Sequence, residues 1–481
     1  MIHGQNWIAG EWLSGSDETL DANPSDRNDP VGRFALVTPA QARAAVASAR
    51  QAFPGWAAAS PLRRHDVLQR AAQEIAARGE ELATLIAREE GKTLADARRE
   101  VVRTAQIFQF HAGECLRSGG EKIASVRDGV DIDITREPLG VVTVITPWNF
   151  PLAIPAWKIA PALAWGNCVV FKPAELVPAS AHALAEILQR AGVPPGVFNL
   201  VVGRSAQIGA ELIESDEVDA ISFTGSAKTG RLVAAAASQA YRLKRVQLEM
   251  GGKNPLVVLD DASIDIAVSC ALDGAFHQTG QRCTASSRVI VTRGIHRRFV
   301  HALVEGMKGL VVGHACHDRT HIGPVADARQ LEQDLSYIEI GKAEGATLAG
   351  GGTRLTRDTD GYFLEPALFI DVHPSMRIAR EEIFGPVAAV LAVADYDEAL
   401  AVANDTEFGL SAGICTASLK HAQHFRRNAQ AGMVMVNLPT AGVDHHVPFG
   451  GTKGSSHGPR EQGTHARDMY TRIKTAYVWG G

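Results

Sequence analysis

The chain has 481 residues, of which 46% are hydrophobic and 21% are charged, which is ordinary for a globular enzyme and suggests about three domains. A formal net charge of −5 excludes the overall basic character of nucleic-acid-binding proteins, so we expect no nucleic-acid partner. No run of about 18 uncharged apolar residues occurs, and no basic segment followed by an apolar one opens the chain, so we expect a cytoplasmic protein without a membrane partner.

Residues 38–115 are predicted to be helical. Apolar residues recur there at spacings of three and four, as at Leu68, Ala71 and Ile75, which is the period of an amphipathic helix. The expected helices are Pro39–Ala52, Leu62–Arg78, Glu80–Glu89 and Leu94–His111.

From residue 139 onward, short apolar runs alternate with helical segments. The expected strands are Val141–Ile145, Cys168–Phe171, Val197–Val202, Ala220–Phe223 and Arg245–Glu249, and the helices among them are Ser180–Ala191, Ala206–Glu214 and Ala227–Ala237. Because these strands are apolar throughout, we predict βαβ units and a parallel sheet that is covered on both faces.

The same alternation resumes after residue 253. The expected strands are Pro255–Leu259 and Arg288–Val291, and the expected helices are Ile264–His277 and His296–Lys308. A second α/β domain is therefore predicted to begin near residue 251. Two segments fit neither domain, Val126–Arg136 and Lys474–Trp479, and we expect them to be strands used in subunit assembly.

The six cysteines are scattered along the chain without a CxxC pair, and in a reducing compartment we expect them to be thiols. His314, Cys316 and His317 lie closer together than zinc ligands usually do, so we expect a surface loop there and no metal. Cys283 differs from the other cysteines because it lies in the loop Gly280–Thr284, between a predicted helix and a predicted strand. A cysteine in such a loop could be a nucleophile if the site activates it, since a free thiol has a pKa of about 8.5.

Several other segments follow predicted strands, and each could be a plain turn or part of a site. Ligands bind beyond the carboxyl ends of parallel strands, where Asn149 could donate to an oxyanion and Lys172 with Glu175 could hold ribose or phosphate. Phe223–Ser226 runs from a strand into a helix, whose N-terminus could bind pyrophosphate, although neither GxGxxG nor a complete triphosphate-binding loop is present. Glu249 precedes paired glycines and could be a general base or part of an interdomain linker.

Taken together, the motifs are more specific than any one of them. TPWNFP, KPAE, FTGS, LEMGGKNP, GQRCT, EEIFGP and PFGG occur in this order in the aldehyde dehydrogenase superfamily, which the chain resembles from about residue 5 to 479. The resemblance implies an α/β fold with a Rossmann-like NAD(P)-binding domain, a second α/β catalytic domain and a small β oligomerisation element. By this resemblance the NAD(P)-binding domain comprises residues 1–122 and 140–250, the catalytic domain 251–455, and the oligomerisation element 123–139 and 456–481.

The resemblance also implies NAD(P)-dependent oxidation of an aldehyde to a carboxylic acid through a cysteine thiohemiacetal and thioester. By it, Cys283 is the nucleophile, Glu249 is the general base, and Asn149 forms the oxyanion hole with the backbone N–H of Cys283. The implied cofactor-binding residues are Trp148, Lys172, Glu175, Gly225, Ser226, Gly251, Glu382 and Phe384. We expect NAD, because a carboxylate such as Glu175 repels a 2′-phosphate, with NADP possible because Lys172 is nearby.

The segment Val436–Gly451 and the sequence GQRCTASSR are similar to bacterial 2-oxoglutarate semialdehyde (2,5-dioxopentanoate) dehydrogenases, which implies that substrate. Trp157 stands where succinic semialdehyde dehydrogenases usually have an arginine, which disfavours their substrate. The residues expected to contact the substrate are Phe150, Ile154 and Trp157 on an apolar wall, and Arg282 and His446 at the distal carboxylate.

Alternatives remain at this point. The substrate could be succinate or glutarate semialdehyde or an aromatic aldehyde. Cys283 and Glu249 could also serve a thiol esterase without net redox chemistry. A non-catalytic relative is disfavoured because Cys283, Glu249 and Asn149 are all present. By resemblance we expect a homodimer or homotetramer.

Overall fold

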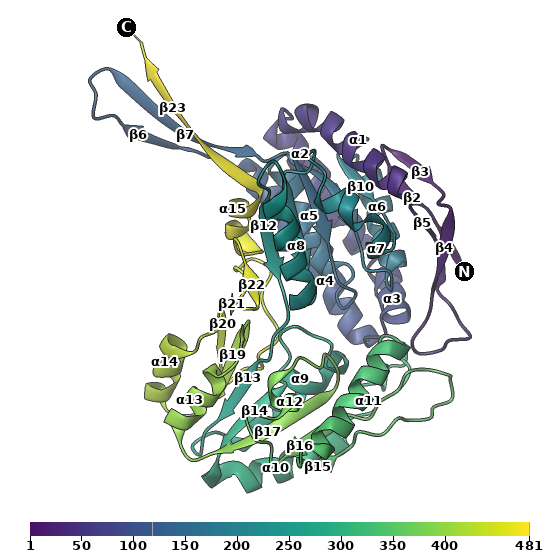
Figure 1. Cartoon of the computed structure of the whole chain (residues 1–481), viewed down its shortest axis with the longest axis vertical. Coiled ribbons are helices and arrows are strands. Elements are labelled where there is room, and N and C mark those ends of the chain that lie inside the picture. Colours follow the sequence, from purple (N-terminus) through teal and green to yellow (C-terminus); the bar gives the residue numbers. More distant parts are fainter. Residues whose placement is uncertain (118, 481) are drawn as a thin grey trace.

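Parallel strands form the centre of the larger sheet in the computed structural model, which describes residues 1–117 and 119–480 (Figure 1). In spatial order its strands are β22 (Ser456–His457), β12 (Arg245–Glu249), β11 (Ala220–Thr224), β8 (Val141–Ile145), β9 (Cys168–Lys172), β10 (Phe198–Leu200), β2 (Asn6–Ile8) and β3 (Glu11–Leu13). Strands β12, β11, β8, β9 and β10 run parallel, which confirms the predicted α/β sheet. Their carboxyl ends therefore lie along one edge of the sheet.

Helices pack against this sheet and extend from it. They are α1 (Pro39–Ala57), α2 (Pro61–Ala77), α3 (Gly79–Glu89), α4 (Leu94–Leu116), α5 (Ala153–Ala164), α6 (Pro178–Arg190), α7 (Ser205–Ile213) and α8 (Ala227–Gln239). The predicted helices are confirmed, but α1 continues past Ala52 and includes Pro54. Its last turn is held by Trp56, which is 2% exposed and donates its indole N–H to the carbonyl oxygen of Leu163 at 3.1 Å.

A second sheet follows after residue 254, as predicted. In spatial order its strands are β15 (Thr347–Gly350), β16 (Ala367–Ile370), β17 (Val387–Val393), β14 (Arg288–Thr292), β13 (Pro255–Val258), β19 (Ser411–Cys415) and β20 (Met433–Val436). Its helices are α9 (Ile264–Phe276), α10 (Arg293–Lys308), α11 (Ala328–Ala343), α12 (Arg377–Arg380), α13 (Tyr396–Asn404) and α14 (Leu419–Asn428). All its neighbouring strands run parallel except β15, which is antiparallel to β16.

Smaller elements complete the chain. They are the sheet of β1 (Ile2–Gly4), β5 (Gly32–Leu36) and β4 (Asp17–Asp21), the pair β18 (Phe408–Gly409) and β21 (Thr452–Lys453), the 3-10 helices η1 (His277–Gly280) and η2 (Gly463–Ala466), and α15 (Arg467–Tyr470).

An antiparallel arm extends away from both sheets (Figure 1). It consists of β6 (Glu121–Ala124), β7 (Val130–Pro138) and β23 (Thr471–Trp479), so the two segments expected to be assembly strands pair with each other. Apolar side chains on β23 face solvent, including Trp479, which is 71% exposed. Only part of residues 456–481 lies in this arm, because β22 pairs with β12 in the larger sheet.

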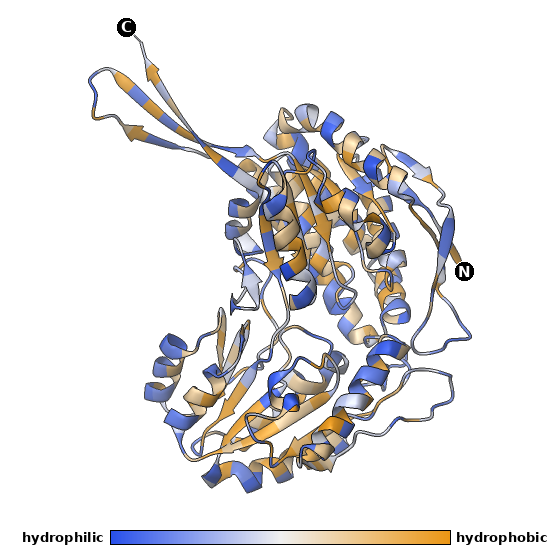
Figure 2. Cartoon of the chain, in the orientation of Figure 1, coloured by the Kyte–Doolittle hydropathy of each residue, from blue (hydrophilic) through white to orange (hydrophobic). Residues whose placement is uncertain are grey.

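The interiors of both sheets are apolar, and polar residues lie on the outer surfaces of the helices (Figure 2). Strand β9 and helix α5 are buried along their whole lengths. None of the helices in residues 1–117 and 119–480 combines the length and apolar character that a membrane crossing requires.

Candidate active site

A cleft of about 600 Å³ lies where the carboxyl ends of β8, β9 and β11 face the second sheet. From the second half of the chain it is lined by the Cys283 loop, the first turns of α11 and the loop after α12. The predicted site residues that line this cleft are Trp148, Asn149, Ile154, Lys172, Glu175, Gly225, Ser226, Gly251, Cys283, Glu382 and Phe384. The fold thus brings the candidate nucleophile and the candidate dinucleotide contacts to one place.

Cys283 is half-buried at this cleft, and its loop is held from both sides. Asn254, which the motif analysis did not single out, donates its side-chain N–H to the carbonyl oxygen of Cys283 at 2.8 Å. Before the loop, the φ angles of Gln278, Thr279 and Gly280 are 52°, 58° and 65°. Two of these residues have side chains that disfavour this left-handed conformation, so the turn is strained and fixes the direction in which the loop leaves α9.

The electrostatic surroundings of Cys283 favour the neutral thiol. Burial, together with the carboxylates of Glu382 and Glu249, raises its pKa to about 12. The thiol therefore needs a base to become a nucleophile.

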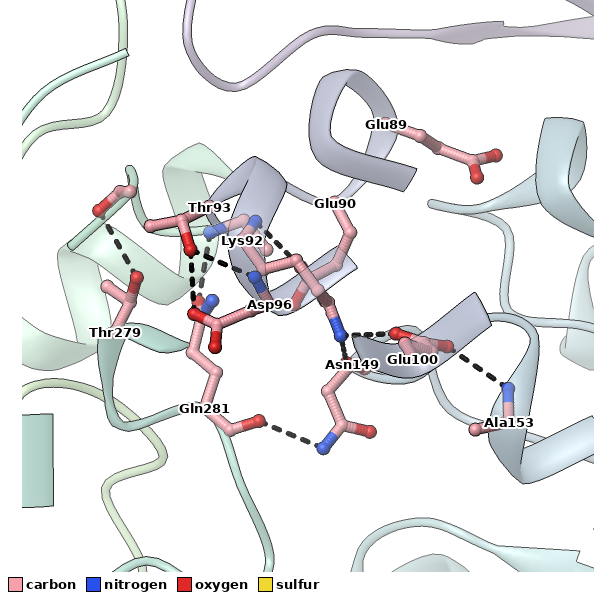
Figure 3. Close-up of polar contacts among 12 residues, drawn as sticks. Glu89, Glu90, Lys92, Thr93, Asp96, Glu100, Asn149, Ala153, Thr279 and Gln281 are labelled. Atoms are coloured by element: carbon pink, nitrogen blue, oxygen red, sulfur yellow. Dashed lines mark hydrogen bonds and ion pairs between the residues drawn. The ribbon is translucent and has the colours of Figure 1, made fainter. Parts of the chain in front are cut away.

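Asn149 is held by contacts to two segments (Figure 3). The side-chain N–H of Asn149 donates to the backbone carbonyl oxygen of Gln281 at 2.9 Å. The backbone carbonyl oxygen of Asn149 accepts from the ammonium of Lys92 at 2.7 Å. Lys92 also pairs with Glu100 at 2.6 Å, and both side chains are 0% exposed. Since a side-chain amide carries two N–H donors, Asn149 retains one for a ligand in the cleft.

Glu100 connects this pair to helix α5. Its second oxygen accepts from the backbone N–H groups of Leu152 at 2.9 Å and Ala153 at 3.1 Å, the latter shown in Figure 3. Leu152 provides no side-chain cap, so the carboxylate from α4 satisfies the first N–H groups of α5. Nothing in the sequence around Lys92 or Glu100 indicated this role, because their partners lie about 50 residues away.

Glu249, the last residue of β12, is buried next to the cleft and is not one of its lining residues. One carboxylate oxygen accepts from Ser456 Oγ at 2.5 Å, and the other from Gln247 Nε2 at 3.3 Å. Burial raises the pKa of Glu249, and the charge of Glu461 raises it further. Glu461 in turn accepts from Lys158, so a buried polar network lies behind Glu249.

The candidate dinucleotide contacts lie at three strand ends. Ser226 caps α8, where its hydroxyl accepts from the backbone N–H of Thr229 at 3.3 Å, and this helix N-terminus faces the cleft. Lys172 is 3% exposed, and burial lowers its pKa while Glu175 opposes that shift. Glu175 is half-buried and accepts from the backbone N–H of Ser205 at 3.2 Å.

Across the cleft, Glu382 accepts from the backbone N–H of Gly252 at 3.0 Å, and burial raises its pKa to about 7. A Cβ atom at Gly251 would lie 2.0 Å from the Glu382 carboxylate, so a larger residue there would displace that carboxylate. The Phe384 ring meets Trp148 edge to face at 5.4 Å. Phe384 has φ of 66°, a strained value that directs its ring into the cleft.

The predicted substrate residues are divided between several environments. Trp157 is buried and stacks on Phe449 at 5.1 Å, and the ammonium of Lys92 lies 4.0 Å above the Phe150 ring. The Arg282 guanidinium donates to the carbonyl oxygen of Gly274 at 3.2 Å and does not line the cleft. His446 is exposed on the turn before Phe449.

Comparison with known proteins agrees with this arrangement. The Aldehyde dehydrogenase family profile matches residues 12–476. An alpha-ketoglutaric semialdehyde dehydrogenase of Bacillus subtilis (strain 168) is 43% identical, covering 98% of this chain and 97% of the relative. A 2,5-dioxopentanoate dehydrogenase of Saccharolobus solfataricus is 39% identical, covering 98% of both chains. The crystal structure of betaine aldehyde dehydrogenase from Staphylococcus aureus in complex with NAD+ superposes with a TM-score of 0.95 at 34% identity, covering 99% of this chain and 95% of that one.

Proposed function

The chain belongs to the aldehyde dehydrogenase family and is an oxidoreductase acting on aldehydes, and from this premise we propose that it oxidises 2-oxoglutarate semialdehyde to 2-oxoglutarate with NAD+. One observation carries the proposal: a single cleft is lined by Cys283, by Asn149 and by the candidate dinucleotide contacts. The choice of aldehyde is supported by the two relatives of similar length whose names carry this substrate.

The residues of the cleft fit a nicotinamide dinucleotide. The space that a Cβ atom would fill at Gly251 lies against Glu382, and the N-terminus of α8 can receive pyrophosphate oxygens beside Ser226. Glu175 can accept ribose hydroxyl groups and repels a 2′-phosphate, so NAD is preferred. NADP is a weaker alternative, because the buried Lys172 beside Glu175 can offer only a partly compensating charge.

In the first half of the reaction, Cys283 passes its proton to the Glu249 carboxylate, which returns it to solvent, and the sulfur adds to the aldehyde carbon. The developing oxyanion is received by the free side-chain N–H of Asn149 and by the backbone N–H of Cys283, and one such donor contributes about 10²- to 10³-fold in rate. When bound, NAD+ supplies the acceptor for the hydride. Cys283 is then acylated as a thioester.

In the second half, Glu249 takes a proton from the water that hydrolyses the thioester. Its raised pKa suits a general base that works near neutral pH. The Glu249 carboxylate accepts a hydrogen bond from Ser456, so its side chain must rotate toward the thioester to act as the base.

The remaining assignments are part of the same proposal. The larger sheet with its helices binds NAD(P), residues 251–455 carry the catalytic half, and the arm formed by β6, β7 and β23 joins subunits into a homodimer or homotetramer. Exposed apolar residues such as Trp479 support a role in subunit contact. The protein acts in the cytoplasm.

Purified protein should reduce NAD+ with 2-oxoglutarate semialdehyde faster than with succinic semialdehyde, glutarate semialdehyde or benzaldehyde. Cys283→Ser should abolish this reduction, because the hydroxyl is a far weaker nucleophile here. Ester hydrolysis that needs no nucleotide, together with no NAD+ reduction on any aldehyde, would overturn the proposal in favour of a thiol esterase.

A further inference from the structure

Arg103 on α4 is a half-buried cation without an ion-pair partner among residues 1–117 and 119–480. Its Nη2 donates to the side-chain oxygen of Gln462 at 3.2 Å, and its buried Nε has no hydrogen-bond partner within residues 1–117 and 119–480. No carboxylate of those residues lies within ion-pair distance of its guanidinium. Burying a charged group without a partner is costly, so the arrangement favours an anion at this position.

Gln462 is the second element of this site. It is 0% exposed, and its side-chain oxygen is used by Arg103. Its amide nitrogen is buried and finds no partner in the part of the chain that the structure describes. Two neighbouring side chains therefore offer unused N–H donors, which is the donor set that a carboxylate needs.

The Arg103 donors lie beside a residue of the predicted substrate wall. The Arg103 guanidinium lies 5.7 Å from the centre of the Trp157 ring, which stacks on Phe449 and belongs to the predicted substrate wall. Burial lowers the pKa of Arg103, while the carboxylates of Glu100 and Asp444 oppose that shift.

A hollow of about 480 Å³ lies one helical turn further along α4. It is lined by Gln106, one turn after Arg103 on α4, and by Thr464, two residues after Gln462. His445 lines the same hollow, and its pKa is lowered by burial, by His446 and by the charge of Arg103. Arg103 and Gln462 do not line the hollow themselves, but each has a neighbour along the chain that does.

We propose that Arg103 and Gln462 bind the carboxylate at the far end of the aldehyde substrate. This inference rests on the proposed function and names the residues that would select a substrate with a distal carboxylate. It replaces two residues expected from the sequence. Arg282 already donates to backbone carbonyls and faces the Asp273 carboxylate, and His446 is exposed.

The chemistry predicts a definite selectivity. A carboxylate can accept from the guanidinium and the amide together, whereas an aldehyde with an alkyl tail leaves both donors buried and unsatisfied. An aldehyde that carries a quaternary ammonium group would be repelled by the guanidinium. The site therefore favours a semialdehyde over uncharged and cationic aldehydes.

The test compares Arg103→Leu, Arg103→Lys and Gln462→Leu with the unchanged enzyme on 2-oxoglutarate semialdehyde and on pentanal. Arg99→Leu is the matched control, because Arg99 lies one turn earlier on α4, is exposed and pairs with Asp96 at 2.7 Å. Binding of 2-oxoglutarate is measured by calorimetry in parallel, and circular dichroism checks that each variant is folded.

Arg103→Leu should raise KM for the semialdehyde and Kd for 2-oxoglutarate by at least about thirtyfold, with kcat on pentanal unchanged. Gln462→Leu should raise the same two constants by about tenfold, and Arg103→Lys should fall between the unchanged enzyme and Arg103→Leu. If Arg103→Leu does not fold, the changes in KM and Kd of the other two variants test the carboxylate site.

Equal losses on both substrates, or an equal effect of Arg99→Leu, would overturn the inference. An unchanged enzyme that prefers pentanal would overturn both the carboxylate site and the proposed substrate. If no aldehyde supports NAD+ reduction, the proposed function fails, while an Arg103-dependent affinity for 2-oxoglutarate would still uphold the binding site.

Discussion

The buried pair of Lys92 and Glu100 gives a quantitative test of how the oxyanion hole is supported. In Lys92→Met the carboxylate of Glu100 loses its counter-ion, and Asn149 loses the donor to its carbonyl oxygen. Both charged side chains are fully buried, and breaking such a pair by removing one partner costs about 3–5 kcal/mol. We therefore expect the free energy of unfolding to fall by that amount, and kcat to fall about 10- to 100-fold because Asn149 is no longer fixed.

The matched control is Arg98→Met, since Arg98 pairs with Glu80 in solvent, where the two side chains are 46% and 71% exposed. An exposed pair contributes less than about 1 kcal/mol, so this variant should stay close to the unchanged enzyme in urea unfolding and in kcat. The double variant Lys92→Met/Glu100→Leu should recover part of the stability, because the Glu100 carboxylate is no longer buried without its counter-ion. Equal stability of Lys92→Met and Arg98→Met would refute the reasoning.

Two further predictions concern pH and cofactor choice. The pKa of Cys283 is raised to about 12, so its thiolate fraction at neutral pH is small and grows with pH. We therefore expect kcat/KM to rise when it is measured across about pH 6 to 9. A profile that is level from pH 7 upward would contradict this assignment. Replacing Glu175 by Gln removes the charge that repels a 2′-phosphate. The ratio of kcat/KM with NADP to kcat/KM with NAD should therefore increase about tenfold. An unchanged ratio would mean that Glu175 does not face the ribose.

The sequence predicted the parallel sheets because their strands are apolar throughout, as in Cys168–Lys172, a pattern typical of strands covered on both faces. Parallel strands place their carboxyl ends together, and this is why motifs as far apart as Lys172 and Gly225 meet in one cleft. The extent of α1 was underestimated because Pro54 suggests a helix end, and the burial of Trp56 that extends the helix is a tertiary effect.

Interactions between distant side chains could not be predicted in this way. Glu249 is oriented by Ser456, which lies 207 residues later in the chain, and no local pattern connects the two. Likewise, an arginine within the helical period of α4 is expected to be a solvated charge, whereas Arg103 is half-buried and contacts Trp157 on α5 and Gln462 after β22.

Helix α4 connects the two ends of the proposed substrate site. Glu100 on this helix caps α5 and, through Lys92, fixes Asn149 at the reacting end. Arg103 lies three residues later on the same helix, where we place the distal carboxylate. Because a single rigid helix carries both supports, the separation between the oxyanion hole and the carboxylate site is set by helix geometry and cannot adjust to the ligand. The enzyme should therefore discriminate between semialdehydes by chain length as well as by charge.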